Sequence, residues 1–230
     1  MARIPRNAVG DVVYHILNRA NGREKIFKKE KDYEAFMKIL TEAKEKYPMR
    51  ILSFCIMPNH WHFVLYPKAG EDLSNFMRWI THTHTQRYHS HYKSIGYGHI
   101  YQGRYKSFPI EKDNHFLQVC RYIERNPLRA KLVKKAQNWK WSSLWIRENG
   151  TKKQKSLLSD WPVEKPIAFL EWVNMTEKDE EDKLQKIRYA IKRGCPYGKE
   201  DWIGKIAKKL NLVSTLIPRG RPLKKVLDPF

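Results

Sequence analysis

The chain has 230 residues, of which 45 are Lys or Arg and 24 are Asp or Glu, giving a formal net charge of +21. A surplus of this size favours nucleic acid as a partner, because cationic side chains neutralise the phosphate backbone. The sequence has no run of 18 apolar residues and no apolar block at its start, which argues against a membrane span and for a cytoplasmic protein.

The first half of the chain alternates strand and helix patterns. Residues 11–17 predict a strand, and residues 30–46 a helix whose apolar positions recur at helical spacing. Residues 49–56 and 60–66 are apolar runs on either side of a Met-Pro-Asn turn, so we expect them to form a β-hairpin. Residues 71–92 predict a further helix.

The second half begins with a glycine-containing loop and a short strand near residues 104–110. Asp113 is a favourable N-cap for a helix over 114–126, which Pro127 is expected to end. Beyond about residue 158 the patterns are helical and lead into a basic tail that contains proline; they cover residues 166–174, 178–193 and 199–211.

This order of elements indicates an α+β fold, with helices packed on one face of a sheet. The change of pattern divides the chain into a sheet domain, residues 1–150, and a small helical, basic C-terminal extension, residues 151–230. Cys55, Cys120 and Cys195 are odd in number and widely spaced, so we expect them to be buried and free, outside any disulfide or zinc site.

Two histidines interrupt the second strand of the expected hairpin, HWHFVLY. Side chains alternate along a strand, so His60 and His62 point to one face while Trp61 points to the other and can be buried. Two convergent imidazoles begin a divalent metal site. The His-x-His pattern also arises by chance, so a purely structural role remains open.

Four more histidines lie in the stretch THTHTQRYHSHY, where the pattern is helical. Residues two apart on a helix are separated by roughly 200° and do not share a ligand. We therefore interpret these residues as solvated or DNA-facing; they are His82, His84, His89 and His91.

The helix predicted after Asp113 places Tyr122 and Asn126 one turn apart on the flank of its apolar stripe. A phenol and an amide oxygen from this edge could approach the histidine pair together. The residues alone leave a second interpretation open, in which Asn126 caps the helix and Tyr122 is a half-buried aromatic with its hydroxyl in water.

Several separated motifs resemble one family in the family's own order. PNHWHFVLYP resembles the His-hydrophobic-His motif of the IS200-like single-tyrosine (Y1) transposases. YHILNRANGREKIF, GRYKSFPIEKD, RYIERNPLRAKLV and WKWSS resemble more closely the REP-associated tyrosine transposases, a branch of that bacterial group. The resemblance covers roughly residues 11 to 146 and is weaker beyond 158.

The resemblance implies a ferredoxin-like (RRM-like) antiparallel sheet, the HUH endonuclease fold. It also implies that one strand of DNA next to a REP-like hairpin is cleaved and rejoined through a covalent 5′-phosphotyrosine. Tyr122 then becomes the nucleophile, and His60, His62 and Asn126 become the ligands of Mg²⁺ or Mn²⁺. IS200-like relatives more often carry Gln at the position of Asn126, so this ligand is a substitution within the pattern.

Basic and aromatic residues interleave on the expected strand near 104–110, a pattern suited to single-stranded DNA because cations hold phosphates and rings stack on bases. Polar residues after the first strand are placed to contact base edges or phosphates, and Arg129 follows the tyrosine helix. The expected DNA-binding residues are Asn18, Arg19, Asn21, Arg104, Tyr105, Lys106, Arg129 and, in the tail, Arg219, Arg221 and Lys224.

Two other functions remain open on the sequence. One is a non-catalytic protein that holds structured nucleic acid on an RRM-like sheet, and the other is an RNA endonuclease that uses the histidines as acid and base. The oligomeric state is also open, because IS200-like relatives act as dimers with exchanged tyrosine helices, whereas the REP-associated branch is better suited to a monomer.

Overall fold

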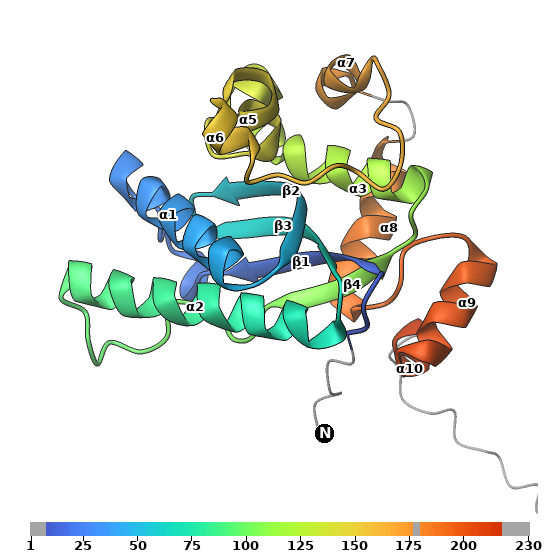
Figure 1. The fold of residues 1–230 in the computed structure, drawn as a ribbon, viewed down its shortest axis with the longest axis horizontal. Helices are drawn as coiled ribbons and strands as arrows, with labels where there is room; N and C mark the ends of the chain where they lie inside the picture. The colour runs from blue at the N-terminus through green and yellow to red at the C-terminus, as the bar shows by residue number, and fades with distance from the viewer. Residues whose placement is uncertain (1–7, 177–179, 218–230) are drawn as a thin grey trace, which may run out of the picture.

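The computed structural model describes residues 8–176 and 180–217. A four-stranded antiparallel sheet in the order β2-β3-β1-β4 forms its centre (Figure 1). The strands are β1 (Val13–Arg19), β2 (Met49–Met57), β3 (His60–Pro67) and β4 (Lys106–Ile110). The predicted hairpin and the ferredoxin-like strand order are thus confirmed.

The helices of the described chain are short except for two that run along the sheet. They are α1 (Glu30–Lys46), α2 (Gly70–Tyr92), α3 (Asn114–Glu124), α4 (Asn126–Arg129), α5 (Ser143–Asn149), α6 (Lys152–Lys155), α7 (Phe169–Asn174), α8 (Glu180–Arg193), α9 (Glu200–Lys209) and α10 (Val213–Leu216), with 3-10 turns η1 (Asn21–Arg23) and η2 (Ala136–Asn138). None of the described helices combines the length and apolar character needed to cross a bilayer.

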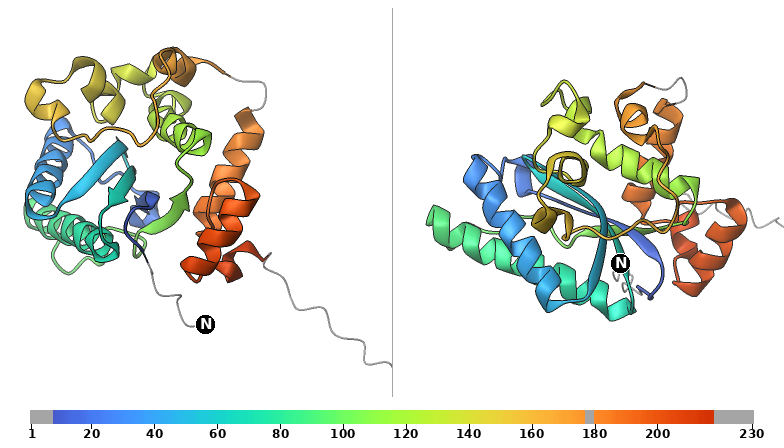
Figure 2. Two further views of the ribbon diagram at one scale, coloured as in Figure 1. Left: turned by 45° about the vertical axis from the view of Figure 1, so that its right-hand side comes forward. Right: turned by 45° about the horizontal axis from the view of Figure 1, so that its top comes forward.

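Helices cover both faces of the sheet, and not one face as expected (Figure 2). Residues that alternate along β2 explain the difference, because Phe54 packs in the cluster with α1 and α2 while Cys55 packs in the cluster with α3. A sheet buried on both sides needs two helical layers. The α+β class itself is confirmed, and Cys55, Cys120 and Cys195 are buried and free.

The face under α1 and α2 corrects the interpretation of His84. His84 is 5% exposed, and its Nδ1 lies 2.7 Å from the hydroxyl of Tyr101. That hydroxyl also accepts a hydrogen bond from Nε1 of fully buried Trp61, at 2.9 Å. His84 is therefore part of a structural network, because it lies on the apolar stripe of α2 with Phe76 and Ile80.

The helix α3 begins as predicted but ends differently. Asp113 is its N-cap and accepts a hydrogen bond from the backbone N–H of His115 at 2.8 Å. The helix ends at Glu124, and after Arg125 the short helix α4 continues the helical path with Pro127 in its first turn. Proline is tolerated there because the first turn has no N–H partner to lose, so Pro127 does not end the helix.

The C-terminal helices hold α3 from outside. Arg125 donates from Nε to Glu180 Oε1 at 2.9 Å and from Nη1 to the carbonyl of Val173 at 2.7 Å, and all of these groups are buried. Phe169 and Ile187 share one apolar cluster with strands of the sheet. The boundary near residue 150 stays a prediction, but residues on both sides of it build this core.

Candidate active site

The two histidines of β3 lie side by side at the start of that strand. Their ring centroids are 5.0 Å apart, with the rings nearly perpendicular. In the pairing with β1, Arg19 lies opposite His60 and Leu17 lies opposite His62, so these side chains share one face. The sequence predicts that both imidazoles lie at the surface of the sheet, but His62 is only 2% exposed.

The Nδ1 atom of each imidazole lies within hydrogen-bond distance of a neighbouring side chain. The Nδ1 of His60 lies 2.6 Å from Oδ1 of Asn59, whose Nδ2 donates to the carbonyl of Arg23 at 2.9 Å. An amide held in this way presents an acceptor, so the proton of His60 is on Nδ1 and its Nε2 carries the free lone pair. The Nδ1 of His62 lies 2.9 Å from Nε2 of His15.

Burial keeps these rings neutral. It lowers the pKa of His60 to about 4, helped by the charge of Arg19, and that of His15 to about 3. Burial, and then the neighbouring His60 and His15, hold the pKa of His62 well below its usual range. Neutral imidazoles with one nitrogen fixed by an outer partner are the form in which histidine ligates metals.

The helix α3 brings Tyr122 against this pair. Its ring centroid is 5.8 Å from that of His62 and 6.4 Å from that of His15, both edge-on. Burial raises the pKa of the phenol, while the guanidinium of Arg129, 4.5 Å from the ring centre, acts in the opposite direction. Tyr122 is therefore protonated at neutral pH and needs activation to act as a nucleophile.

Hydrogen-bond donors without partners surround the tyrosine. Arg129 donates from Nη2 to the carbonyl of Tyr122 and to Oδ1 of Asn126. Its Nη1, the Nδ2 of Asn126 and the Nε of Arg19 are buried and have no partner among the described residues. Buried donors are normally satisfied, so a group of three marks a place suited to an anion.

The residues fit a divalent cation at His60 and His62, whose Nε2 atoms have no hydrogen-bond partner in residues 8–176 and 180–217. Asn126 is one turn from Tyr122 as predicted, but among the described residues it has no hydrogen bond to either imidazole, and its Oδ1 faces Arg129. To ligate an ion, Oδ1 of Asn126 would have to exchange its hydrogen bond from Arg129 for the ion. Its role as third ligand stays a prediction.

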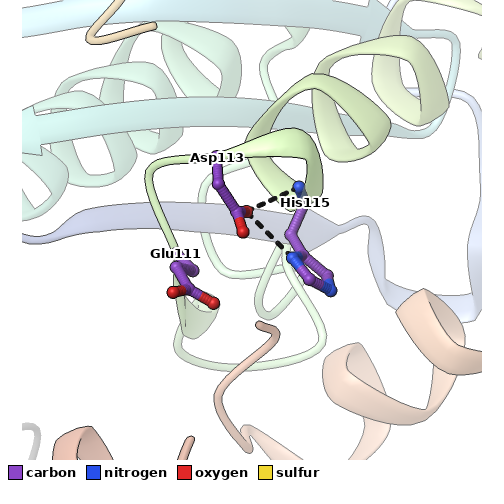
Figure 3. A group of neighbouring side chains, drawn as sticks. All are labelled: Glu111, Asp113 and His115. Atoms are coloured by element: carbon purple, nitrogen blue, oxygen red, sulfur yellow. Dashed lines mark hydrogen bonds and ion pairs between the residues drawn. The ribbon is translucent and has the colours of Figure 1, made fainter. Parts of the chain in front are cut away.

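A second group of metal-type side chains lies at the opposite end of α3, formed by Glu111, Asp113 and His115 (Figure 3). Its carboxylates already interact with other groups of the protein. Asp113 accepts from His115 and lies 3.7 Å from the ammonium of Lys199, and Glu111 accepts from the backbone N–H of Lys199 at 2.6 Å. The group caps α3 and ties it to the segment before α9.

A basic groove of about 570 Å³ runs beside β4 and reaches Arg19. Exposed Arg104 and Lys106 line one wall, and residues of α8 and α10 line the other. Arg19 lines the groove and also lies opposite His60 in the pairing of β1 with β3, so it connects the groove to the histidine pair. The predicted cations Arg19, Arg104 and Lys106 are thus brought together.

Other predicted DNA-binding residues are placed differently. Asn18 is 5% exposed, and its amide binds the carbonyl of Gly103 and the backbone N–H of Arg19, so it holds the chain and does not read bases. Tyr105 is 6% exposed and packs in the core, which leaves no open ring for stacking. Asn21 is exposed. The predicted tail residues lie outside the described residues; they are Arg219, Arg221 and Lys224.

His15 was not predicted to belong to the site. It lies on β1 in the same alternating set as Leu17 and Arg19, and only the antiparallel pairing of β1 with β3 puts it beside His62. The alternation was visible in the sequence, but the identity of the neighbouring strand was not.

The family model for IS200-like transposases matches residues 8–126, which include the histidine pair, Tyr122 and Asn126. The match spans more than half of the chain. The chain belongs to the IS200-like transposase family, as the sequence motifs suggested.

Two solved structures are similar to the chain. A REP-associated tyrosine transposase bound to a REP hairpin is 18% identical over 73% of this chain and 99% of its own, with a TM-score of 0.52, and supports the fold. A protein of Deinococcus radiodurans R1, assigned as a transposase, is 19% identical over 54% of this chain and 96% of its own. Its TM-score is 0.38. Comparison with curated proteins finds no match.

Proposed function

We propose that this transposase cleaves and rejoins one strand of DNA beside a REP-like hairpin through a covalent phosphotyrosine on Tyr122. The observation that carries the proposal is the edge-on contact of Tyr122 with His62, 5.8 Å between ring centroids. Residues 60 positions apart in the chain thereby combine a nucleophile with a metal-ligand pair. The REP-associated relative, which was solved with a REP hairpin, supports hairpin DNA as the substrate.

In the proposed reaction the oxygen of Tyr122 attacks the scissile phosphorus, and the bond to the 3′ oxygen breaks to release a DNA 3′-OH. One phosphodiester replaces another, so a 3′-OH can later reverse the step without water. His60 and His62 would hold a cation such as Mg²⁺ or Mn²⁺, which would supply charge neutralisation at the scissile phosphate. The unpartnered N–H groups of Arg19 and Arg129 are suited to stabilise the same phosphate.

The experiment uses a single-stranded hairpin oligonucleotide labelled at either end, incubated with the full chain and Mn²⁺. A denaturing gel is expected to show a protein adduct that retains the label of the 3′ fragment only, because the tyrosine holds the 5′ phosphate. A binding protein would retard the oligonucleotide in a native gel but form no adduct. Metal-independent cleavage of an RNA hairpin would favour an endonuclease that uses histidine chemistry.

The basic groove predicts that affinity for the hairpin falls steeply with salt. Each phosphate contact contributes a slope of about −0.7 to −0.9 in a plot of log affinity against log salt. Replacing Arg104 or Lys106 by Gln should weaken binding and reduce that slope by about one unit each. Binding that is unchanged between about 50 and 200 mM salt would contradict a phosphate-lined groove.

A further inference from the structure

The loop between α2 and β4 presents two large apolar side chains to solvent. Ile95 is 79% exposed and Tyr97 is 86% exposed, and every residue from 95 to 99 is exposed. Among the described residues they are the one pair of exposed large apolar side chains only two positions apart. Single exposed apolar residues are common, but an exposed aromatic beside an aliphatic residue indicates a contact surface.

The backbone holds Tyr97 away from the protein. Gly96 and Gly98 on either side of it have φ of +92° and +90°, a conformation that side chains other than glycine rarely adopt. A Cβ at either glycine would meet no atom within 4 Å. The glycines are therefore required for their backbone conformation, and not because another part of the chain packs closely against them. The N–H of Tyr97 donates to the carbonyl of Ser94 at 3.2 Å, which closes a turn.

Both ends of this loop are fixed, and one of them is fixed beside the active site. The N–H of Ser94 donates to the carbonyl of His89 at 3.0 Å. The carbonyl of Ile100 accepts from Asn21 at 2.8 Å, just after Arg19, which lies opposite His60. Figure 1 shows the loop following α2 at the end of the sheet where β2 turns into β3. Three residues of chain place Tyr97 within roughly 11 Å of Ile100.

The surroundings of the loop suit a polyanion. Arg23, Lys25 and Lys93 are exposed near its two ends, and Glu24 is an exposed acidic residue between two of them. A basic rim around an exposed aromatic ring is the combination that binds nucleic acid by phosphate contact and base stacking. A protein partner would need a larger apolar area than two side chains supply.

We propose that Tyr97 stacks on a nucleobase of the hairpin DNA that is held at the active site, with Ile95 nearby in the same loop. The stacked base is either unpaired or at the open end of the stem, where a π face is accessible. The inference rests on the proposed function only in taking DNA as the partner, and it assigns Tyr97 no part in strand cleavage.

The test measures the affinity of the full chain, in EDTA, for a fluorescein-labelled DNA hairpin with a short single-stranded flank. Tyr97→Ala is expected to weaken binding roughly 5- to 150-fold, the loss for one stacked base, and Tyr97→Trp to retain it. The salt slope should be unchanged in both variants, because neither removes a charge. Lys93→Gln should reduce the slope by about one unit instead.

A matched control distinguishes stacking from general loss of apolar surface. Ile167 is fully exposed beside α7, and Ile167→Ala should leave affinity unchanged. A series of hairpins with 2-aminopurine at successive positions should show quenching at one site that Tyr97→Ala abolishes. The proposal would be overturned if Tyr97→Ala bound the hairpin with wild-type affinity. It would also be overturned if this variant sedimented differently from the wild type in the absence of DNA. Wild-type binding in EDTA, with no adduct after Mn²⁺ is added in a parallel reaction, would count against the cleavage reaction alone.

Discussion

Two buried histidine sites lie on opposite faces of the same sheet, one with His60 and His62 and the other with His84. Burial keeps both sites neutral, and it lowers the pKa of His84 to about 3, as it does for His15. The two sites differ in what surrounds the rings. His84 is hydrogen-bonded to the hydroxyl of Tyr101. Its ring stacks on that of Phe27, with the two ring centroids 5.3 Å apart.

In the strand pair both Nδ1 atoms have hydrogen-bond partners. Within the part of the chain that the structure describes, both Nε2 atoms and N–H groups of Arg19 and Arg129, beside Tyr122, have none. A lowered histidine pKa therefore shows at both sites that the ring is buried. It does not distinguish a functional histidine from a structural one. The direction of the free nitrogen and the presence of unsatisfied donors separate a reactive site from a structural one.

The largest expected difference is between two tyrosines, one in each site. Tyr122→Phe should abolish the DNA adduct while leaving the fold intact, because the hydroxyl is the proposed nucleophile. Tyr101→Phe should keep the adduct but lower the free energy of unfolding by about 1–3 kcal/mol, because Trp61 and His84 lose a buried partner. Gel assays and urea unfolding of both variants check this; an adduct formed by Tyr122→Phe would refute the assignment.

A smaller effect is expected from two buried histidines with the same pKa of about 3. His15→Phe should weaken Mn²⁺ binding about 10- to 100-fold, because His62 loses the partner that fixes its Nδ1. His84→Phe should leave Mn²⁺ affinity unchanged. Calorimetric titration of Mn²⁺ into the two variants makes the comparison, and equal affinities would show that His15 does not support the ligand.

The smallest effect concerns pH and is common to both sites. Histidines with a pKa of 6.5 in the unfolded chain and about 3 in the folded one stabilise the fold fully above pH 6.5. Below pH 6.5 only the unfolded chain takes up their protons, so stability falls with pH, by up to about 1.4 kcal/mol per pH unit for each histidine.

His84→Phe should therefore make the fall in the free energy of unfolding between pH 6.5 and 5 shallower than in the wild type. Urea unfolding at several pH values measures the slope. A slope that matches the wild type would mean that His84 is protonated in the folded chain.

The sequence predicted the part of the site that local patterns determine. Strand alternation placed His60 and His62 on one face, with Trp61 fully buried on the other. Helical spacing placed Tyr122 and Asn126 one turn apart. His84 was misinterpreted although the signal was present, because it continues the apolar spacing of Phe76 and Ile80 along α2.

The remainder depended on contacts between distant segments. His15 and Arg19 join the site only because β1 pairs with β3, and strand order is not encoded in the pattern of one strand. Tyr105 lies in a basic stretch that suggests exposure, but its side chain is only 6% exposed and belongs to the apolar core. The hydrogen bond from Arg125 to Glu180 joins residues 55 positions apart.

The segment before α9 lies along the outer edge of β4. The N–H of Tyr197 donates to the carbonyl of Pro109 at 2.9 Å, and its carbonyl accepts from Glu111 at 3.0 Å. An uncovered strand edge invites pairing with other chains and aggregation. A fragment that ends at the predicted domain boundary near residue 150 would keep every proposed catalytic residue and open this edge. For expression and crystallisation, the segment around Tyr197 should therefore be kept with the sheet.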